Sequence, residues 1–549
     1  MTASPEAKLV LKESKTSQSF EFNVGEVNGG GEVEVSRLGA RAEILDPQRV
    51  CIHGAILDAA NKQPAQVRLS MRSPNGQYIP PYGHRREVNA GWFQDYGADL
   101  QLGDTSFAYI DGRFQVELPV GDVYVEVTKG FEYEPIRRRV TIAPGQRELK
   151  LEISHLYDLR SQGWSSGDTH VHFISPSTAV REGQAEGLNL VNLLASQWGD
   201  MFTNVGDFHA GPLTSRDRET IVWIGTENHQ HILGHINLIG TRSPIMPMCT
   251  GGPVESWIGD PVLSSMAEWA DAARERDGLA VAPHFPWPNG ELAADIVLGK
   301  LDAIEIRPAF GEQFDALNIQ EYYRYLNCGY RLPIVGGTDK MQSGYPVGGE
   351  RAYVYVGEGE FSFDLWAKGL KRGNTFMSAG PLLFLKVEGR NPGEEITVRS
   401  GGATLDITVE AKSAIPFHLV QIVMNGKVVA SRDARNGTRE MKLQDNIKVD
   451  GPAWLAARCS SRFSTAPASD GYPFRVCAHT SPVYVKVSGQ ELFSPPAASY
   501  MLQLLQSSLT WLDNLAIRPD PEQFQRIRKV FIDAQERLHQ RLHAQAIPH

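Results

Sequence analysis

Long apolar runs are missing from this sequence of 549 residues, and so are homopolymer runs. A membrane-spanning helix needs about 20 predominantly apolar residues, which no segment supplies. The N-terminus, MTASPEAKLVLKESKTSQSFEF, also lacks an apolar core of signal-peptide length. We therefore expect a cytoplasmic protein with no membrane partner.

Cysteine is scarce, and its five positions show no CxxC spacing: Cys51, Cys249, Cys328, Cys459 and Cys477. An odd, scattered set fits reduced thiols in a reducing compartment rather than a disulfide framework. None has an evident histidine partner nearby in the sequence, so we do not predict a cysteine nucleophile.

An excess of positive charge is also absent, because 64 acidic residues outnumber 54 basic ones and give a formal net charge of −10. This balance argues against a general electrostatic affinity for nucleic acid. We expect a small-molecule substrate and no nucleic acid partner, and we leave a homo-oligomer open. With 42% hydrophobic and 21% charged residues, the chain has the composition of a folded protein with several domains.

Changes in the pattern of apolar and polar residues divide the chain into several regions. After an extension over residues 1–49, residues 50–158 alternate as strands between Gly, Pro and Asn punctuation, which predicts a β-sandwich. Its segment 111–129 resembles the transthyretin-like regulatory domains found beside many hydrolases. Strand patterns return over 386–490, with Asn425-Gly426 as a tight hairpin turn, and two helices fill 491–549.

Residues 159–385 alternate short apolar runs with helical stretches such as SSMAEWADAARERDG, which is the pattern of an α/β parallel sheet or barrel. Several strand-like runs end in polar residues, as in THVHF, TIVWIGTEN, LAVAPHF and LPIVGGTDK. Barrel enzymes place their chemistry at the C-terminal ends of strands. We therefore predict an α/β barrel with a site at these ends.

Metal-ligand residue types gather at those strand ends. His170 and His172 are two residues apart, so on a strand both imidazoles face the same side. An HxH pair alone is a weak signal, since paired histidines often serve only as hydrogen-bonding groups. Later strand ends add two histidines and two carboxylates, and this donor set suits two ions such as zinc or manganese. The added residues are Glu227, His235, His284 and Asp339.

The order of these motifs (DxHxH, a Gly-x-Glu segment, GHxNxxG, a His-containing strand end and GGTDKM) resembles the polymerase-and-histidinol-phosphatase (PHP) superfamily, and within it the carbaryl-hydrolase-like CehA/McbA branch. The resemblance implies a PHP-type distorted (β/α)7 barrel flanked by β-domains. It also implies that His170, His172, Glu227 and Asp339 surround one metal. Glu227, His235 and His284 would surround the second.

The chain departs from the superfamily where many members hold a third metal. Ser196-Gln197-Trp198 and Asp339-Lys340-Met341 stand where histidine-containing motifs are found, and no histidine follows His172 until His209. Because the third ion is associated in the family with phosphate esters, we expect two metals and cleavage of an ester, carbamate or amide bond. A phosphoesterase is the nearest alternative. A binding or scaffold protein with a degenerate barrel is a third, which the complete set of six ligands disfavours.

Further residues are weaker candidates, and each has a plain structural alternative. Lys340 would place a positive charge over the substrate oxygen, and Asp168 would orient a ligating histidine. His209 and His231 are candidate proton shuttles, as is His229. The substrate-pocket candidates are two arginines that would bind a carboxylate and three aromatic residues that would form an apolar wall: Arg307, Arg351, Trp198, Phe285 and Trp287.

Overall fold

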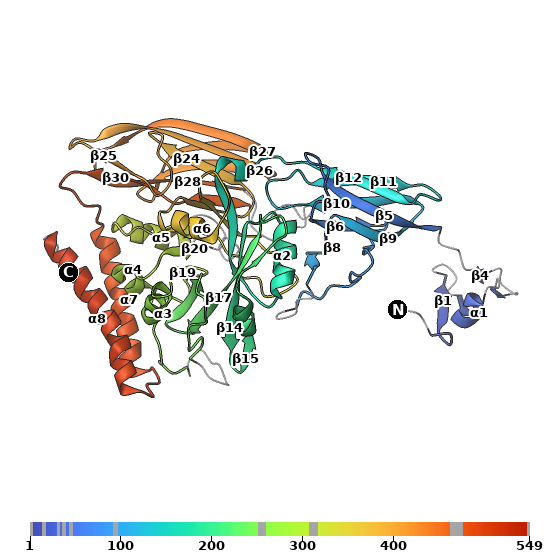
Figure 1. Ribbon diagram of the computed structural model, residues 1–549, viewed down its shortest axis with the longest axis horizontal. Coiled ribbons are helices and arrows are strands. Elements are labelled where there is room, and N and C mark those ends of the chain that lie inside the picture. Colours follow the sequence, from blue (N-terminus) through green and yellow to red (C-terminus); the bar gives the residue numbers. More distant parts are fainter. Residues whose placement is uncertain are drawn as a thin grey trace.

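The structure is a computed structural model of the chain. It describes residues 4–13, 18–29, 33–35, 40–42, 48–91, 97–250, 260–306, 317–461 and 476–545. Figure 1 shows a β-sandwich at one end, a central α/β region with a second β-region above it, and two long helices on the far side. The N-terminal extension carries short elements: β1 (Lys8–Lys12), β2 (Ser19–Asn23), α1 (Val24–Asn28), β3 (Val33–Val35) and β4 (Ala40–Ala42).

The β-sandwich consists of a five-stranded sheet in the order β11-β10-β6-β8-β7 and a three-stranded sheet in the order β12-β5-β9. Alternate residues are buried along β9, as the period of two in its sequence requires. The buried sides of the two sheets share one hydrophobic core. The strands are β5 (Arg49–Asp58), β6 (Val67–Arg72), β7 (Asp99–Leu102), β8 (Thr105–Ile110), β9 (Arg113–Pro119), β10 (Gly121–Thr128), β11 (Ile136–Ile142) and β12 (Glu148–Ile153).

The central region begins after a short 3-10 turn, η1 (Arg160–Gln162), and alternates strands with helices. Most of its strands are buried, because helices and neighbouring elements cover them. The strands are β13 (Trp164–Val171), β14 (Leu190–Trp198), β15 (Met201–Thr203), β16 (Leu213–Thr214), β17 (Ile221–Gln230), β18 (Gly234–Ile239), β19 (Leu279–Ala282), β20 (Ala303–Glu305), β21 (Ile334–Val335), β22 (Arg351–Tyr355) and β23 (Thr375–Ser378). The helical elements are α2 (Pro176–Ala185), η2 (Val205–Ala210), α3 (Met266–Arg274), α4 (Leu292–Leu298), α5 (Leu317–Asn327) and α6 (Phe363–Lys371).

The α/β class predicted from the sequence is confirmed, but the sheet is mixed rather than uniformly parallel. β13, β14 and β17 run parallel, as do β19, β20 and β21, whereas β18 is antiparallel to both of its neighbours. β22 is antiparallel to β13 and continues through β23 into the C-terminal strands. The short connection from β17 to β18 explains the reversal, since a crossover between parallel strands needs a dozen or more residues.

The C-terminal strands are β24 (Leu382–Val387), β25 (Glu395–Val398), β26 (Ala403–Met424), β27 (Lys427–Val449), β28 (Ala453–Ser460), β29 (Cys477–Thr480) and β30 (Val483–Val487). The predicted hairpin turn is confirmed: Asn425 and Gly426 have φ of 49° and 83°, and Met424 pairs with Lys427. Two helices, α7 (Pro495–Asn514) and α8 (Pro521–Ala544), pack their apolar faces into the largest hydrophobic core. In the described part of the chain, no helix has the length and hydropathy needed to cross a membrane.

Candidate metal centre

The ends of five strands bring together the six residues that the sequence analysis selected. His170 ends β13 and His172 follows it, Glu227 lies in β17 and His235 in β18, while His284 and Asp339 follow β19 and β21. Their ligand atoms form two groups, each within 4.8 Å: His170, His172 and Asp339 in one, and Glu227, His235 and His284 in the other. Residues separated by up to 169 positions therefore converge because the strand ends share one edge of the sheet.

Glu227 joins the two groups. Its Oε1 atom lies 3.4 Å from Nε2 of His170, 3.2 Å from Nδ1 of His235 and 3.6 Å from Nε2 of His284. Its Oε2 atom lies 3.2 Å from Nε2 of His172. Asp339 closes the other side, with Oδ1 3.4 Å from Nε2 of His170. A carboxylate placed between two ligand groups is positioned to bridge two ions.

The donor atoms fit a metal pair. Nε2 of His170 and of His172 and Oε2 of Glu227 are buried and form no hydrogen bond. Buried polar atoms normally have partners, so this cluster of nitrogen and oxygen atoms has the chemistry of a cation-binding site. Four imidazoles and two carboxylates suit borderline divalent ions such as zinc and manganese.

The pKa values of the clustered histidines and carboxylates depend on burial and on one another's charge. Burial opposes a charge on His170, but the carboxylates of Asp339, Glu305 and Glu227 outweigh it and raise the pKa of His170 well above its usual value. Burial likewise opposes the charge of Glu227, yet the surrounding histidines lower the pKa of Glu227 well below its usual value. Burial lowers the pKa of His235 to about 4, so this imidazole is a neutral donor near neutral pH.

Glu305 is the residue that sequence reasoning missed. Both of its carboxylate oxygens lie 3.3 Å from Nδ1 of His170, the nitrogen opposite the proposed ligand atom. A carboxylate at this position fixes the tautomer and orientation of a metal-binding imidazole. The signal was its place at the end of LDAIEIRP, where we selected Arg307 instead. Arg307 lies outside the described residues.

Neighbouring residues hold the Glu305 carboxylate in place through hydrogen bonds and a close glycine contact. Thr169 donates its hydroxyl to Oε2 at 3.2 Å, and Asn237 donates its amide at 3.4 Å. A Cβ atom at Gly337 would lie only 2.6 Å from the same oxygen, so the close approach of this loop requires glycine. On the other histidine, Nδ1 of His172 lies 3.2 Å from the carbonyl oxygen of Leu194 and 3.0 Å from Oγ of Ser196.

Asp168 does not have the predicted role. Its carboxylate accepts hydrogen bonds from three backbone N–H groups instead: His170 at 3.0 Å, Thr338 at 2.9 Å and Gly348 at 2.7 Å. Burial raises the pKa of Asp168 against these hydrogen bonds. Asp168 thus ties the β13 end to the loop that carries Asp339, and Glu305 takes the histidine-orienting position.

Two of the six residues adopt left-handed backbone conformations, which residues other than glycine seldom adopt. His284 has φ of 33° and Asp339 has φ of 49°. Such conformations in residues other than glycine are costly and persist where the surrounding structure enforces them, often at functional sites. For His284, the carbonyl oxygen of Trp287 receives a hydrogen bond from Nδ1 at 2.5 Å, which fixes the ring.

Lys340 and Arg351 point into the protein rather than toward a substrate. Lys340 is 1% exposed, and its Nζ donates to the carbonyl oxygens of Gln342 at 3.0 Å and Tyr345 at 2.9 Å. Arg351 is also 1% exposed and donates to the carbonyl oxygens of Gly348 at 2.6 Å and Glu186 at 2.9 Å. Both predictions are corrected, because the ammonium group of Lys340 and the guanidinium of Arg351 are hydrogen-bonded to backbone carbonyls inside the protein.

Replacing Arg351 by lysine tests this structural reading. Lysine keeps the charge but lacks the planar guanidinium, which lies 4.1 Å from the centroid of the Phe131 ring. It would also lose the hydrogen bond to the carbonyl oxygen of Glu186. We expect the free energy of unfolding to fall by about 1 to 2 kcal/mol, with metal content unchanged. Thermal unfolding measures the loss, and the exposed Arg138→Lys is the matched control. Lost activity without lost stability would instead favour substrate recognition by Arg351.

The remaining candidates divide by exposure. Phe285 is 2% exposed and belongs to the hydrophobic core, so its assignment to the pocket is corrected. Trp198 and Trp287 flank His235, with ring centroids 6.4 Å and 6.5 Å away. His231 lies beside the cluster, with Nδ1 2.5 Å from Oδ2 of Asp260 and its ring 6.0 Å from that of His235. His209 is exposed on η2, and no contact with the cluster is found for it in the structure.

No protein-family model and no curated protein matches the chain. Among solved structures, PsfC from Pseudomonas syringae is 15% identical, with a TM-score of 0.25 over 37% of this chain and 88% of that one. Endonuclease Q bound to duplex DNA with an abasic lesion is 14% identical, with a TM-score of 0.25 over 38% of this chain and 56% of that one. The endonuclease PfuEndoQ from Pyrococcus furiosus is 16% identical, with a TM-score of 0.24 and the same coverage.

The exclusion of nucleic acid as a partner is overturned by these comparisons, since two of the similar structures are endonucleases and one contains duplex DNA. The physical error lies in the use of net charge. A charge of −10 summed over 549 residues does not describe the potential at one site, which metal ions would also change. The likeness itself is distant and assigns no substrate to this chain.

Proposed function

We propose that this protein is a metal-dependent hydrolase of the PHP type, holding two divalent ions, zinc or manganese, between its six clustered side chains. The observation that carries the proposal is the position of Glu227, whose two oxygens lie within 3.6 Å of nitrogens from four different histidines. A buried carboxylate surrounded by imidazoles from β13, β18 and β19 and the residues that follow them supports a metal-binding role.

The chain's own residues have distinct parts in this proposal. Two divalent ions bound here would lower the pKa of a water molecule and polarise the oxygen of the scissile bond. Glu227 bridges the two ligand groups, and Glu305 holds His170 with Nε2 directed inward. His231, oriented by Asp260, is our candidate to deliver a proton to the leaving group. Trp198 and Trp287 form an aromatic wall beside His235.

The inward orientation of two basic side chains, Lys340 and Arg351, favours a carbonyl substrate over a phosphate ester. Phosphoryl groups are commonly held by lysine or arginine. Lys340 and Arg351 are both committed to backbone carbonyls inside the protein. Together with the departures from the three-metal motifs of the PHP superfamily, this supports cleavage of an ester, carbamate or amide bond.

The deciding experiment compares initial rates on an aryl N-methylcarbamate, an aryl ester, an aryl phosphate and an aryl phosphodiester. The protein is loaded with zinc or manganese, and His170→Ala serves as the control because it removes one ligand. We expect the fastest turnover on the carbamate or ester, and at least about a 100-fold loss in the variant.

The other outcomes identify the alternatives. Preference for the phosphate or phosphodiester would establish a phosphoesterase and contradict the carbonyl assignment. Failure of the protein to retain metal after exposure to zinc or manganese, with no turnover of any substrate, would reject the hydrolase and favour a binding or scaffold protein.

A further inference from the structure

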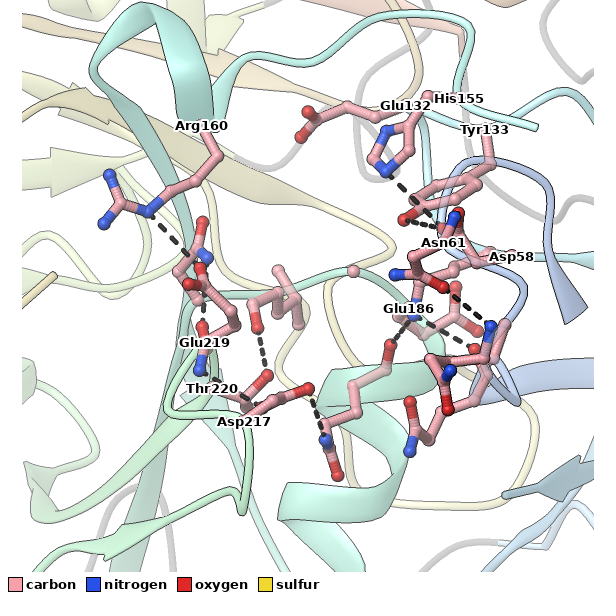
Figure 2. A pocket seen from close by; sticks show the side chains of 18 of the residues that line it. Asp58, Asn61, Glu132, Tyr133, His155, Arg160, Glu186, Asp217, Glu219 and Thr220 are labelled. Carbon is pink, nitrogen blue, oxygen red and sulfur yellow. Dashed lines mark hydrogen bonds and ion pairs between the residues drawn. The ribbon is translucent and has the colours of Figure 1, made fainter. Parts of the chain in front are cut away.

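A cavity of about 810 Å³ lies where the β-sandwich meets the central sheet, away from the metal centre (Figure 2). The β5–β6 loop, the segment after β10, the end of α2 and the β16–β17 loop line it, and none of the six clustered residues does. Its volume is typical of small-molecule sites, which favour domain interfaces. The cavity therefore has the size and position of a second ligand site.

The lining of this cavity is acidic: it includes seven carboxylate side chains against three of lysine or arginine. Two of the bases have partners. Arg160 places Nε 3.4 Å from Oε2 of Glu219, and Lys129 donates from Nζ to the carbonyl oxygens of Gln66, at 3.0 Å, and Gln184. Burial also lowers the pKa of Lys129 to about 8. The cavity thus favours a cation and disfavours an anion.

Asp58 offers a defined position for a positive group. Its Oδ1 accepts the N–H of Ala60 at 2.8 Å, but the donors nearest Oδ2 are the hydroxyl of Tyr133 at 3.4 Å and Nε2 of His155 at 3.9 Å. These distances exceed those of normal hydrogen bonds. The rings of Tyr133 and His155 lie against each other beside it, with centroids 3.8 Å apart and planes tilted by 38°. A carboxylate beside aromatic rings is a favourable environment for an ammonium group.

Carboxylates also occupy the rest of the cavity. Glu132 accepts the N–H of Leu159 at 3.0 Å, and its burial raises its pKa to about 7, so a neighbouring cation would help it stay ionised. Figure 2 shows Asp217 and Glu219 across the cavity from Asp58, Tyr133 and His155. Negative groups at two separated ends fit a ligand with two positive ends.

We propose that this cavity binds an organic diamine or polyamine, with one ammonium group at Asp58 beside Tyr133 and His155 and another at Asp217 and Glu219. The proposal is independent of the hydrolase assignment, because it involves no residue of the metal centre. A saccharide would leave the excess of negative charge uncompensated, and a phosphorylated ligand would be repelled by it.

Calorimetric titration of the full-length protein with spermidine tests the proposal. We expect saturable binding with a Kd below about 1 mM. The Asp58→Asn variant removes one charge while keeping the shape of the side chain, and we expect it to weaken binding at least about tenfold. Glu219→Gln should weaken binding at the opposite end, which keeps the test decisive if Asp58→Asn fails to fold. The exposed Asp450→Asn is the matched control and should bind as the parent protein does.

Two further titrations separate the alternatives. Spermidine should still bind His170→Ala, so loss of the metal centre and loss of amine binding are distinguishable. Sucrose and inorganic phosphate, at the same ionic strength, should give no saturable heat. Absence of spermidine binding, equal binding by folded Asp58→Asn and Glu219→Gln, or saturable binding of sucrose or phosphate in its place would overturn the proposal.

Discussion

Replacing Glu227 with glutamine is expected to lower kcat/KM by at least roughly 1000-fold, which corresponds to about 4 kcal/mol of transition-state stabilisation. The substitution keeps the shape of the side chain but removes the negative charge that lies within 3.6 Å of four histidine nitrogens. A neutral amide is a poor bridging ligand, so the bound metal should fall from two ions per chain toward one or none. Steady-state kinetics on the best substrate and elemental analysis of the purified protein measure the two effects.

The matched control for this variant is Glu410→Gln, because Glu410 is a surface residue that pairs with Lys442 at 2.9 Å far from the metal centre along the chain. The control should keep both the metal content and the rate. If Glu227→Gln retained two ions and full activity, Glu227 would not be a bridging ligand, and the proposed centre would be wrong.

Replacing Glu305 with alanine should weaken metal binding by about 10- to 100-fold, although Glu305 is not a proposed ligand. The change leaves Nδ1 of His170, the hydroxyl of Thr169 and the amide of Asn237 without their shared acceptor. His170 would then lose both its fixed orientation and the carboxylate that favours donation from Nε2. Competition for zinc against a chelator of known affinity gives the change in Kd.

Glu305→Gln separates the effect of orientation from the effect of charge, because it keeps a hydrogen-bond acceptor but removes the negative charge. Its amide oxygen can still accept a hydrogen bond from Nδ1 of His170, so we expect a smaller loss of affinity than in Glu305→Ala. Equal losses in both variants would show that charge rather than orientation matters. Unchanged affinity in Glu305→Ala, with the protein folded, would contradict the positioning role.

The sequence predicted the residues of the centre because their signals are local. A strand places alternate side chains on one face, so His170 and His172 could be read as a pair. Glu227, His284 and Asp339 each come late in or after a short apolar run, whereas His235 lies at the start of β18. The Asn425-Gly426 turn was predictable for the same reason, since its backbone conformation depends on two residues. These six side chains come together once the strand ends lie at the same edge of the sheet.

Other assignments failed because they depended on side-chain direction. Lys340 directly follows Asp339 in the sequence, yet its ammonium group enters the interior and lies 3.7 Å from the buried carboxylate of Glu182. Asp168, two residues from His170, accepts backbone N–H groups, whereas the distant Glu305 contacts Nδ1 of His170. Net charge misled us about nucleic acid because it averages over the whole molecule.

By itself, the sequence determined the strand and helix patterns, the α/β class of the central region and the choice of six metal-ligand candidates, since these follow from periodicity and from residue chemistry at strand ends. The tertiary structure decided which carboxylate orients His170, which cations turn inward and where β18 reverses the sheet. It also created the acidic cavity, whose walls come from segments up to about 160 residues apart. These features arise from packing between distant segments, and local patterns carry no information about which distant side chains will meet.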